Sequence, residues 1–323
     1  MGSACRGVPM SDIIQRIKRR FAFSDSEFNT YLNTAPFRYK NYTIPKRSGG
    51  VRLISQPSKD LKSIQRFILS EFLLPKLEIH ECATAYREER NIADNARPHL
   101  QNQFLLKMDF KDFFPSIRAI DFSQYALRRS IVESEEEATM LGKIFFKSTN
   151  NGLRLSIGSP GSPPISNAVM INFDKQISSM CRDSGIAFTR YSDDLTFSSN
   201  SKGILFGIPN QVQEVLEVIQ RPKLMINAEK TKFSSKKFNR HVTGITITND
   251  GLMSLGRQTK RRVRSEVYNA PSMQPKERQR LRGYLSYAKQ FEPSFVIKLW
   301  EKYPAQMALI KNSAFTKRNG DPQ

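Results

Sequence analysis

Two adjacent aspartates, Asp193 and Asp194, point most directly to chemistry in this chain. They lie between two runs, 186–190 and 195–198, whose aromatic and β-branched residues are typical of short strands. The acids are therefore predicted at the tip of a hairpin. Two carboxylates about 4 Å apart repel by roughly 4 kcal/mol at an effective dielectric of about 20, so a bound cation would stabilise the pair. A solvated Asp-Asp turn is the alternative.

A third acid, Asp109, ends a nearly continuous apolar run that begins at Phe104, as expected of a buried strand with a carboxylate at its exit. Three carboxylates brought together from this strand and from the hairpin suit hard divalent cations, Mg²⁺ above all. Two such ions about 3.5–4 Å apart activate a hydroxyl and stabilise a leaving pyrophosphate. The predicted catalytic residues and metal ligands are therefore Asp109, Asp193 and Asp194.

The composition favours a nucleic-acid partner. The chain of 323 residues has 51 Lys and Arg against 30 Asp and Glu, a formal net charge of +21. A basic protein of the membrane surface would show the same balance, but no apolar run approaches about 20 residues. The N-terminus lacks the apolar core of a signal peptide, and the three cysteines suit a reducing compartment. We therefore expect a cytoplasmic protein without a membrane partner.

Three segments together resemble the motifs of reverse transcriptases. Residues 191–194 resemble the Y-x-D-D box, and residues 109–114 resemble the first metal-binding motif. Residues 158–167 resemble the segment beneath the template and the incoming nucleotide. The resemblance implies an RNA-directed DNA polymerase with two Mg²⁺ ions and an α+β right-hand fold, made of fingers, a palm with an antiparallel sheet backed by helices, and a helical thumb. It also implies that the backbone carbonyl of Phe110 completes a metal site.

Two further elements resemble those of bacterial retron reverse transcriptases. Residues 95–99 read Asn-Ala-Arg-Pro-His, similar to the N-A-x-x-H element, and residues 242–244 read Val-Thr-Gly, similar to the V-T-G element. The resemblance implies that a structured RNA from the same locus is both template and primer. Synthesis would start at an internal guanosine 2′-hydroxyl and give branched RNA–DNA, called msDNA. The residues predicted to bind RNA are Asn95, His99, Val242, Thr243, Gly244, Arg257, Lys260, Arg261 and Arg264.

The same resemblance implies further partners. These are dNTPs, the cognate non-coding RNA with its msDNA product, and a separately encoded effector protein in a defence system against phage. The sequence shows no second acidic cluster that can be assigned to ribonuclease H, so the host's ribonuclease H is expected to act in trans. Two other readings stay open: a reverse transcriptase of another prokaryotic group, or a catalytically silent RNA-binding relative.

A basic hairpin is predicted from two strand-like runs, 37–45 and 51–56. In reverse transcriptases the corresponding fingers hairpin closes over the triphosphate, and Arg52 is the residue predicted to contact it. A guanidinium can grip phosphate oxygens in a bidentate way. An exposed basic turn that includes Lys46 and Arg47 is the alternative.

Two other residues are predicted to contact the nucleotide. Phe114 stands where the family sets a bulky ring against the sugar C2′, which would exclude a ribose hydroxyl. A core role is the alternative, since the adjacent Phe113 could exchange roles with it. Lys230 is expected to contact or protonate the leaving pyrophosphate, and a surface lysine that faces phosphate is the alternative.

The floor beneath the nascent base pair is predicted at Ser159 and Pro160, where small residues let nucleic acid approach the backbone. Ser156, Ile157 and Gly161 depart from the commoner family pattern of proline, glutamine and serine or threonine. These departures put the detailed template contacts in doubt and leave the metal site intact.

The predicted domains are an N-terminal helix and fingers over 1–102, a palm over 103–250 with an inserted fingers segment near 120–160, and a thumb over 251–323. Helices are predicted within 120–148 and near 211–220. The thumb is predicted from a basic helix near 257–264 and from a second helix that starts near 276.

Overall fold

The computed structural model describes residues 10–46 and 49–313, so Arg47 of the predicted basic turn lies outside the described residues. The chain divides into two compact units. The first comprises Met1–Arg90, Leu106–Phe197 and Gly203–Lys232. The second comprises Asn91–Leu105, Ser198–Lys202 and Phe233–Gln323. Both units contain helices and strands, which confirms the predicted α+β class.

The N-terminal part of the first unit contains the predicted hairpin. Its elements are α1 (Met10–Phe21), α2 (Asp25–Thr34), β1 (Tyr39–Pro45), β2 (Val51–Pro57) and α3 (Lys59–Ile68). β1 and β2 pair antiparallel with Ile44 opposite Arg52. Gly49 and Gly50 have φ values of 88° and 77°, a left-handed backbone that glycine adopts without strain and that the reversal here requires.

The segment predicted to be helical over 120–148 forms two helices. They are α6 (Ala119–Arg128) and α7 (Glu135–Phe145), followed by a short antiparallel pair, β4 (Lys147–Thr149) and β5 (Gly152–Arg154). α7 begins where the Ser134 hydroxyl accepts a hydrogen bond from the amide of Glu137. The acidic residues of its first turn favour the positive end of the helix dipole. The β4–β5 pair is not among the predicted elements.

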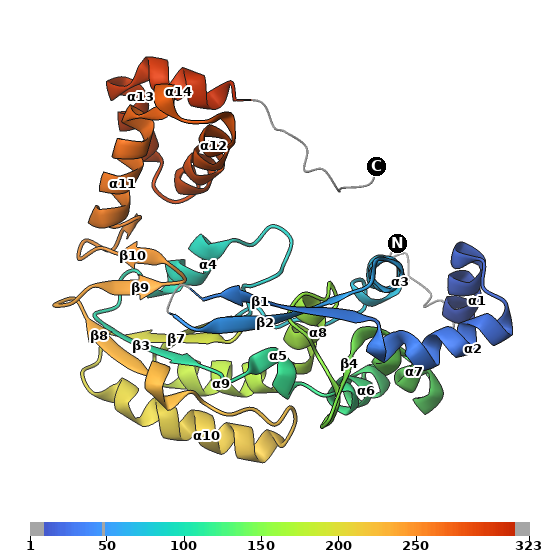
Figure 1. Ribbon diagram of the computed structural model, residues 1–323. Coiled ribbons are helices and arrows are strands. Elements are labelled where there is room, and N and C mark those ends of the chain that lie inside the picture. Colours follow the sequence, from blue (N-terminus) through green and yellow to red (C-terminus); the bar gives the residue numbers. More distant parts are fainter. Residues whose placement is uncertain (1–9, 47–48, 314–323) are drawn as a thin grey trace, which may run out of the picture. The chain divides into compact units, whose positions relative to one another are not determined.

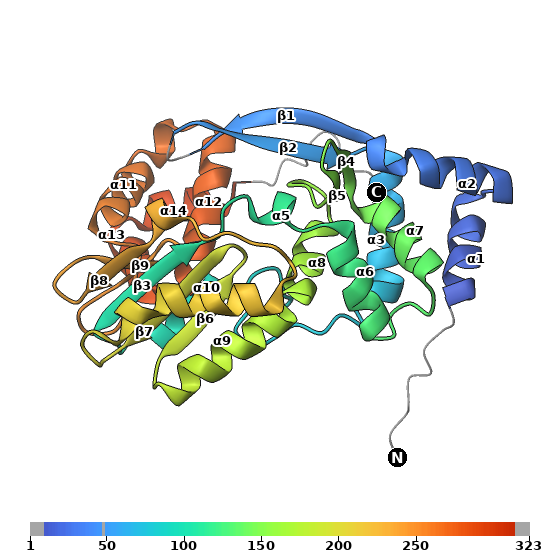
Figure 2. The same cartoon turned by 90° about the horizontal axis from the view of Figure 1, so that it is seen from below.

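A four-stranded sheet carries the predicted catalytic residues. Its order is β6-β7-β3-β8, with β6 (Ala187–Tyr191), β7 (Asp194–Ser199), β3 (Phe104–Asp109) and β8 (Lys232–Ser235). Helices α9 (Ile171–Asp183) and α10 (Ile208–Ile219) lie across one face of β6, β7 and β3 (Figures 1 and 2). The short helices α5 (Phe113–Ser116) and α8 (Ser162–Val169) complete this part. The helix predicted near 211–220 is thus confirmed as α10.

The second unit begins with α4 (Ile92–Ala96) and a three-stranded antiparallel sheet. The strands are β9 (Arg240–Val242), β10 (Ile245–Ile247) and β11 (Met253–Ser254), in the order β11-β10-β9. α4 lies beside β10 (Figure 1). One apolar cluster joins them, formed by Ala93, Ala96, Leu105, Val242, Ile245 and Ile247.

Four helices follow in the described part of the second unit. They are α11 (Arg257–Tyr268), α12 (Pro275–Lys289), α13 (Pro293–Lys302) and α14 (Pro304–Lys311). α11 and α12 confirm the two predicted helices, and Leu281, Leu285 and Ala288 of α12 are buried. α13 and α14 are additions to the prediction. Each begins with proline, whose missing N–H costs nothing at the first position of a helix. None of the described helices has the length and apolar character that crossing a membrane requires.

Candidate active site

The hairpin predicted to carry catalytic acids (the catalytic hairpin, β6–β7) forms, and β3 lies next to it. Asp109 is the last residue of β3 and is 7% exposed, while Asp193 and Asp194 stand at the β6–β7 reversal. The amide of Phe110 donates to the carbonyl of Asp193 at 3.1 Å, which ties the exit of β3 to the turn. Ser192 makes the reversal with a φ of 62°. The structure therefore brings the three predicted acids to one place.

The electrostatics of these acids show that they interact. Burial raises the pKa of the Asp193 carboxyl to about 6, and the charges of Asp194 and Asp109 add to that rise. Burial also raises the pKa of Asp194, with Asp109 adding to it and Lys107 opposing it. Carboxyls whose charges disfavour one another in a partly buried place gain from a cation that lies among them.

The three carboxylates are ligands of the kind that a hard divalent cation prefers, but their present arrangement does not hold one. Within the described ranges, no group of three or more His, Cys, Asp and Glu side chains is arranged to hold a metal ion. The Lys230 ammonium instead donates to Asp109 Oδ1 at 2.8 Å, and this hydrogen bond raises the pKa of Lys230. Three carboxylates suit Mg²⁺. To bind it at Asp109, the carboxylate must exchange the ammonium for the metal.

Lys230 lies in a one-turn helix, Ala228–Lys230, that is connected to β3. The amide of Asn227 donates to the carbonyl of Asp109 at 2.7 Å, and the amide of Lys111 donates to the carbonyl of Met225 at 2.8 Å. The 60% exposed side chain of Lys230 therefore extends from a fixed backbone. This position leaves the ammonium free to exchange Asp109 for a phosphate.

A buried ion pair fixes the catalytic hairpin from within. Arg190 is fully buried and donates to both carboxylate oxygens of Asp174 on α9, at 2.7 and 2.6 Å. Its Nη1 also donates at 3.1 Å to the carbonyl of Ser192 and at 3.1 Å to the side chain of Asn167. Burial opposes the charge on Arg190, but Asp174 raises the pKa of the guanidinium overall. Arg190, Asp174 and Asn167 are absent from the sequence-based prediction, because nothing in their spacing indicates that they meet.

The two adjacent phenylalanines differ in their surroundings. Phe113 is 3% exposed and stacks on Phe110, with ring centroids 5.8 Å apart. Phe114 is only half-buried, and its ring lies 6.3 Å from that of Tyr86. The ring centroid of Tyr86 lies 6.4 Å from that of Tyr191, and the Tyr86 hydroxyl donates to Ser192 Oγ at 3.3 Å. Phe114 is thus the ring available beside the catalytic hairpin, and Tyr86 joins it as a neighbour that the sequence does not reveal.

Arg52 lies in the exposed first half of β2, opposite Ile44. Burial raises the pKa of the Tyr86 hydroxyl, and the charge of Arg52 partly opposes that rise. Within the described residues, no hydrogen bond or ion pair engages the guanidinium of Arg52.

The two predicted floor residues differ in burial. Ser159 is 4% exposed and donates to the side-chain oxygen of Gln65 at 3.0 Å. Gln65 in turn donates to the carbonyl of Ile144 at 2.7 Å. The Ser159 hydroxyl is therefore engaged inside the protein, whereas Pro160 is half-buried. Close packing also explains the departure at Gly161, where an added Cβ would lie 2.3 Å from the ring of Phe145.

The two short elements, 95–99 and 242–244, meet within the second unit although 148 positions separate Asn95 from Thr243. The Asn95 amide donates to Thr243 Oγ1 at 3.3 Å. Asn95, His99 and Val242 have no exposed surface. Direct contact with RNA, predicted for these three, would require the interior to open.

His99 is held by β7, since its Nδ1 lies 2.6 Å from Ser198 Oγ. Burial lowers the pKa of this imidazole to about 3. Thr243 and Gly244, by contrast, form the β9–β10 turn with φ values of 46° and 85°, and Gly244 is exposed. The buried residues Asn95 and Val242 thus support the turn formed by Thr243 and Gly244, which reaches the surface.

Comparison with known proteins identifies the family. Residues 44–247 match the family model "Reverse transcriptase (RNA-dependent DNA polymerase)". The chain is 39% identical over 284 residues to the Retron Ec83 reverse transcriptase of Escherichia coli, which covers 86% of this chain and 91% of that protein. It is 32% identical over 300 residues to the Retron Ec73 reverse transcriptase of the same organism, covering 88% and 93%. Among solved structures, a Candida albicans telomerase aligns with a TM-score of 0.49 at 12% identity, over 89% of this chain and 59% of that one.

Proposed function

This chain belongs to the reverse transcriptases, which are RNA-directed DNA polymerases, and among them to the bacterial retron enzymes, and from that premise we propose that it makes branched RNA–DNA. The proposed template and primer is a structured RNA from its own locus, extended from an internal guanosine 2′-hydroxyl. The observation that carries the proposal is the convergence of Asp109, Asp193 and Asp194. Burial raises the pKa of Asp193 to about 6, and the charges of Asp194 and Asp109 add to that rise.

Reverse transcriptases use divalent metal ions, and we propose Mg²⁺ with two ions per site. Asp109 and Asp193 would hold them with Asp194 and the carbonyl of Phe110. When bound, the ions supply activation of the attacking hydroxyl and stabilisation of the leaving pyrophosphate. The protein's own part is to fix the carboxylates through the β3 exit and the Arg190 network, and to hold the Lys230 ammonium where it can exchange Asp109 for phosphate.

The nucleotide would lie between the catalytic hairpin and the ring of Phe114. The half-buried ring of Phe114 supports selection of dNTPs over rNTPs by exclusion of the 2′-hydroxyl. The exposed Arg52 supports contact with the triphosphate. Buried Ser159 would shape the floor through its bond to Gln65 and not by direct contact.

We assign the fingers to 1–102 with a further segment near 120–160, the palm to the rest of 103–250, and the thumb to 251–323. The basic α11 helix, with Arg257, Lys260, Arg261 and Arg264, is proposed to bind the cognate RNA. A separate effector protein, host ribonuclease H acting in trans, defence against phage and a cytoplasmic location belong to the same proposal. They rest on family membership.

The test uses the protein expressed with its native flanking locus. Copurifying nucleic acid is separated after ribonuclease, deoxyribonuclease and debranching treatment. We expect a discrete DNA that migrates faster after debranching in the wild type and in the Asp183→Asn control, whose carboxylate lies exposed at the end of α9. The same DNA should be absent with Asp193→Asn. Unbranched DNA in the wild type, or branched DNA in Asp193→Asn, would overturn the proposal.

A further inference from the structure

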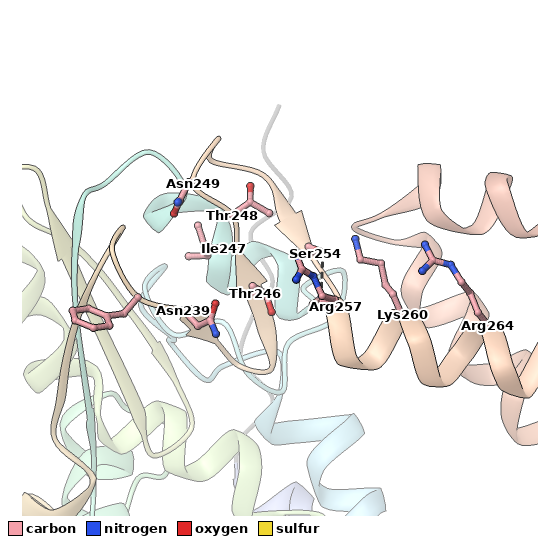
Figure 3. Close-up of a pocket in the computed structure, with 11 residues that line it drawn as sticks. Asn239, Thr246, Ile247, Thr248, Asn249, Ser254, Arg257, Lys260 and Arg264 are labelled. Atoms are coloured by element: carbon pink, nitrogen blue, oxygen red, sulfur yellow. Dashed lines mark hydrogen bonds between the residues drawn. The ribbon is translucent and has the colours of Figure 1, made fainter.

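A pocket of about 480 Å³ opens in the second unit between the three-stranded sheet and α11. Figure 3 shows Arg257, Lys260 and Arg264 in order along α11, with Thr246, Thr248 and Asn249 on the neighbouring strand and turn. The lining is completed by Phe238, Asn239, Ile247, Ser254 and Gly256. All these residues belong to one unit, and the volume lies in the range of sites for small organic ligands.

One wall of the pocket is built firmly. Lys260 donates to Glu292 Oε1 at 2.6 Å, and Glu292 also accepts from the amide of Leu255 at 2.8 Å. The turn into α11 needs Gly256, which has φ 79° and ψ 155°, a region that other residues hardly enter. A Cβ at Gly256 would lie 2.8 Å from Thr246 Oγ1. The sequence therefore keeps the helix close against β10.

Three other polar side chains of the pocket have no partner among the residues that the structure describes. Within the described part of the chain, no hydrogen bond or ion pair engages the guanidinium of Arg257 or the side-chain amides of Asn239 and Asn249. Phe238 is 71% exposed. An aromatic face, two amides and a guanidinium thus line one pocket and are available to a ligand.

This set of groups fits one chemical class. Proteins bind unpaired RNA bases by stacking them on aromatic rings and by hydrogen bonds to the base edges, while cations hold the phosphate. Side-chain amides offer both a donor and an acceptor to a base edge. A duplex backbone would use the cations but would leave the ring and the amides unsatisfied.

We propose that this pocket holds one unpaired nucleotide of the cognate RNA, with its base on Phe238, its edge at Asn239 or Asn249, and its phosphate at Arg257. The inference rests on the proposed use of a structured RNA. Of the four basic residues of α11 that are proposed to bind RNA, Arg261 lies outside the pocket lining and would contribute only charge.

The test is a double-mutant cycle on RNA affinity. The probe is the RNA that copurifies with the wild-type protein, identified by sequencing and made by transcription. Phe238→Ala should weaken binding roughly 10-fold or more, and Phe238→Tyr should restore most of it. Arg257→Ala should weaken binding and lower the salt slope of the affinity by about 0.7, the value for one phosphate of a single strand.

The decisive quantity is the coupling between the two positions. If one nucleotide is held by both side chains, the double variant Phe238→Ala/Arg257→Ala loses less than the product of the single losses, by about 3-fold or more. The matched pair Phe238→Ala/Arg261→Ala should multiply to within about 2-fold, since Arg261 is an arginine of the same helix outside the pocket. Thermal melting checks that each variant is folded.

The outcomes separate the two proposals. The expected result has two parts. The wild type binds the probe more tightly than an unrelated structured RNA of equal length, and Phe238 is coupled to Arg257 but not to Arg261. The same preference with multiplicative losses in both pairs would overturn the pocket and leave the proposed function standing. Equal affinity of the wild type for both RNAs would overturn the use of a cognate RNA and the pocket with it.

Discussion

The catalytic hairpin of the first unit and the α11 pocket of the second unit use charge in opposite ways. At the hairpin, Arg190 is fully buried and donates to Asp174, Asn167 and the carbonyl of Ser192. In the pocket, Arg257 is exposed and has no partner among the described residues. A group that must fix geometry is satisfied inside the protein, whereas a group that must bind a ligand is left available.

The largest expected effect comes from removing Arg190, the buried arginine whose partners lie inside the protein. Arg190→Met leaves the buried carboxylate of Asp174 uncompensated, which should lower the free energy of unfolding by about 3–5 kcal/mol. Arg190→Met/Asp174→Leu replaces the pair with apolar side chains and should recover most of that stability. Urea unfolding measures both variants.

The double variant also separates positioning from folding. It still lacks the hydrogen bond to the carbonyl of Ser192, so we expect kcat for primer extension to stay at least roughly 10-fold low while the KM for dNTP changes little. Full recovery of kcat together with stability would show that Arg190 serves the fold alone.

A second prediction compares two adjacent rings. Phe113 is buried against Phe110, whereas Phe114 is half-buried beside the catalytic hairpin. Phe114→Ala removes the ring proposed to exclude the 2′-hydroxyl and should reduce the preference for dNTP over rNTP by roughly 10- to 100-fold. The measurement is the ratio of kcat/KM for the two substrates. Phe113→Leu, which keeps an apolar core, serves as the control; an equal loss of preference in both variants would contradict the assignment.

The last prediction concerns a satisfied group in the second unit, His99, whose effect is small for each single pH unit. Its pKa is lowered to about 3 in the folded protein, so the unfolded chain binds its proton first as the pH falls below about 6.5. The free energy of unfolding should therefore fall by roughly 1.4 kcal/mol per pH unit from about pH 6 downward, and the loss should end near the folded pKa.

Urea unfolding across this pH range measures that slope. His99→Gln should reduce the slope by about one proton. An identical slope in the wild type and in His99→Gln would show that other groups cause the pH dependence.

The elements that carry Asp109, Asp193 and Asp194 could be predicted from sequence because their signals are local. The apolar run that ends at Asp109 and the two strand-like runs around Asp193 are each read from a few neighbouring residues. The hairpin around Arg52 is local in the same sense. Helices α13 and α14 are not predicted because they are short and begin directly at Pro293 and Pro304, and proline is also common in loops.

The side-chain networks could not be predicted from such signals. Arg190 meets Asp174 only because α9 lies on the sheet, and Asn95 meets Thr243 across 148 positions of sequence. The sequence suggested that both short elements bind RNA, but it does not show that Asn95 is interior. The α11 pocket escapes for the same reason, since Phe238 and Arg257 come from different elements.

The proposed chemistry depends most on Asp109, Asp193 and Asp194 binding metal together once Lys230 leaves Asp109. The direct test is Mn²⁺ binding followed by electron paramagnetic resonance, with a dideoxy-terminated primer on an RNA template and the next dNTP. We predict two bound ions in the wild type and in Asp183→Asn, and weak or no binding with Asp193→Asn. Equal binding of both ions by Asp193→Asn would contradict the metal site and with it the proposed chemistry.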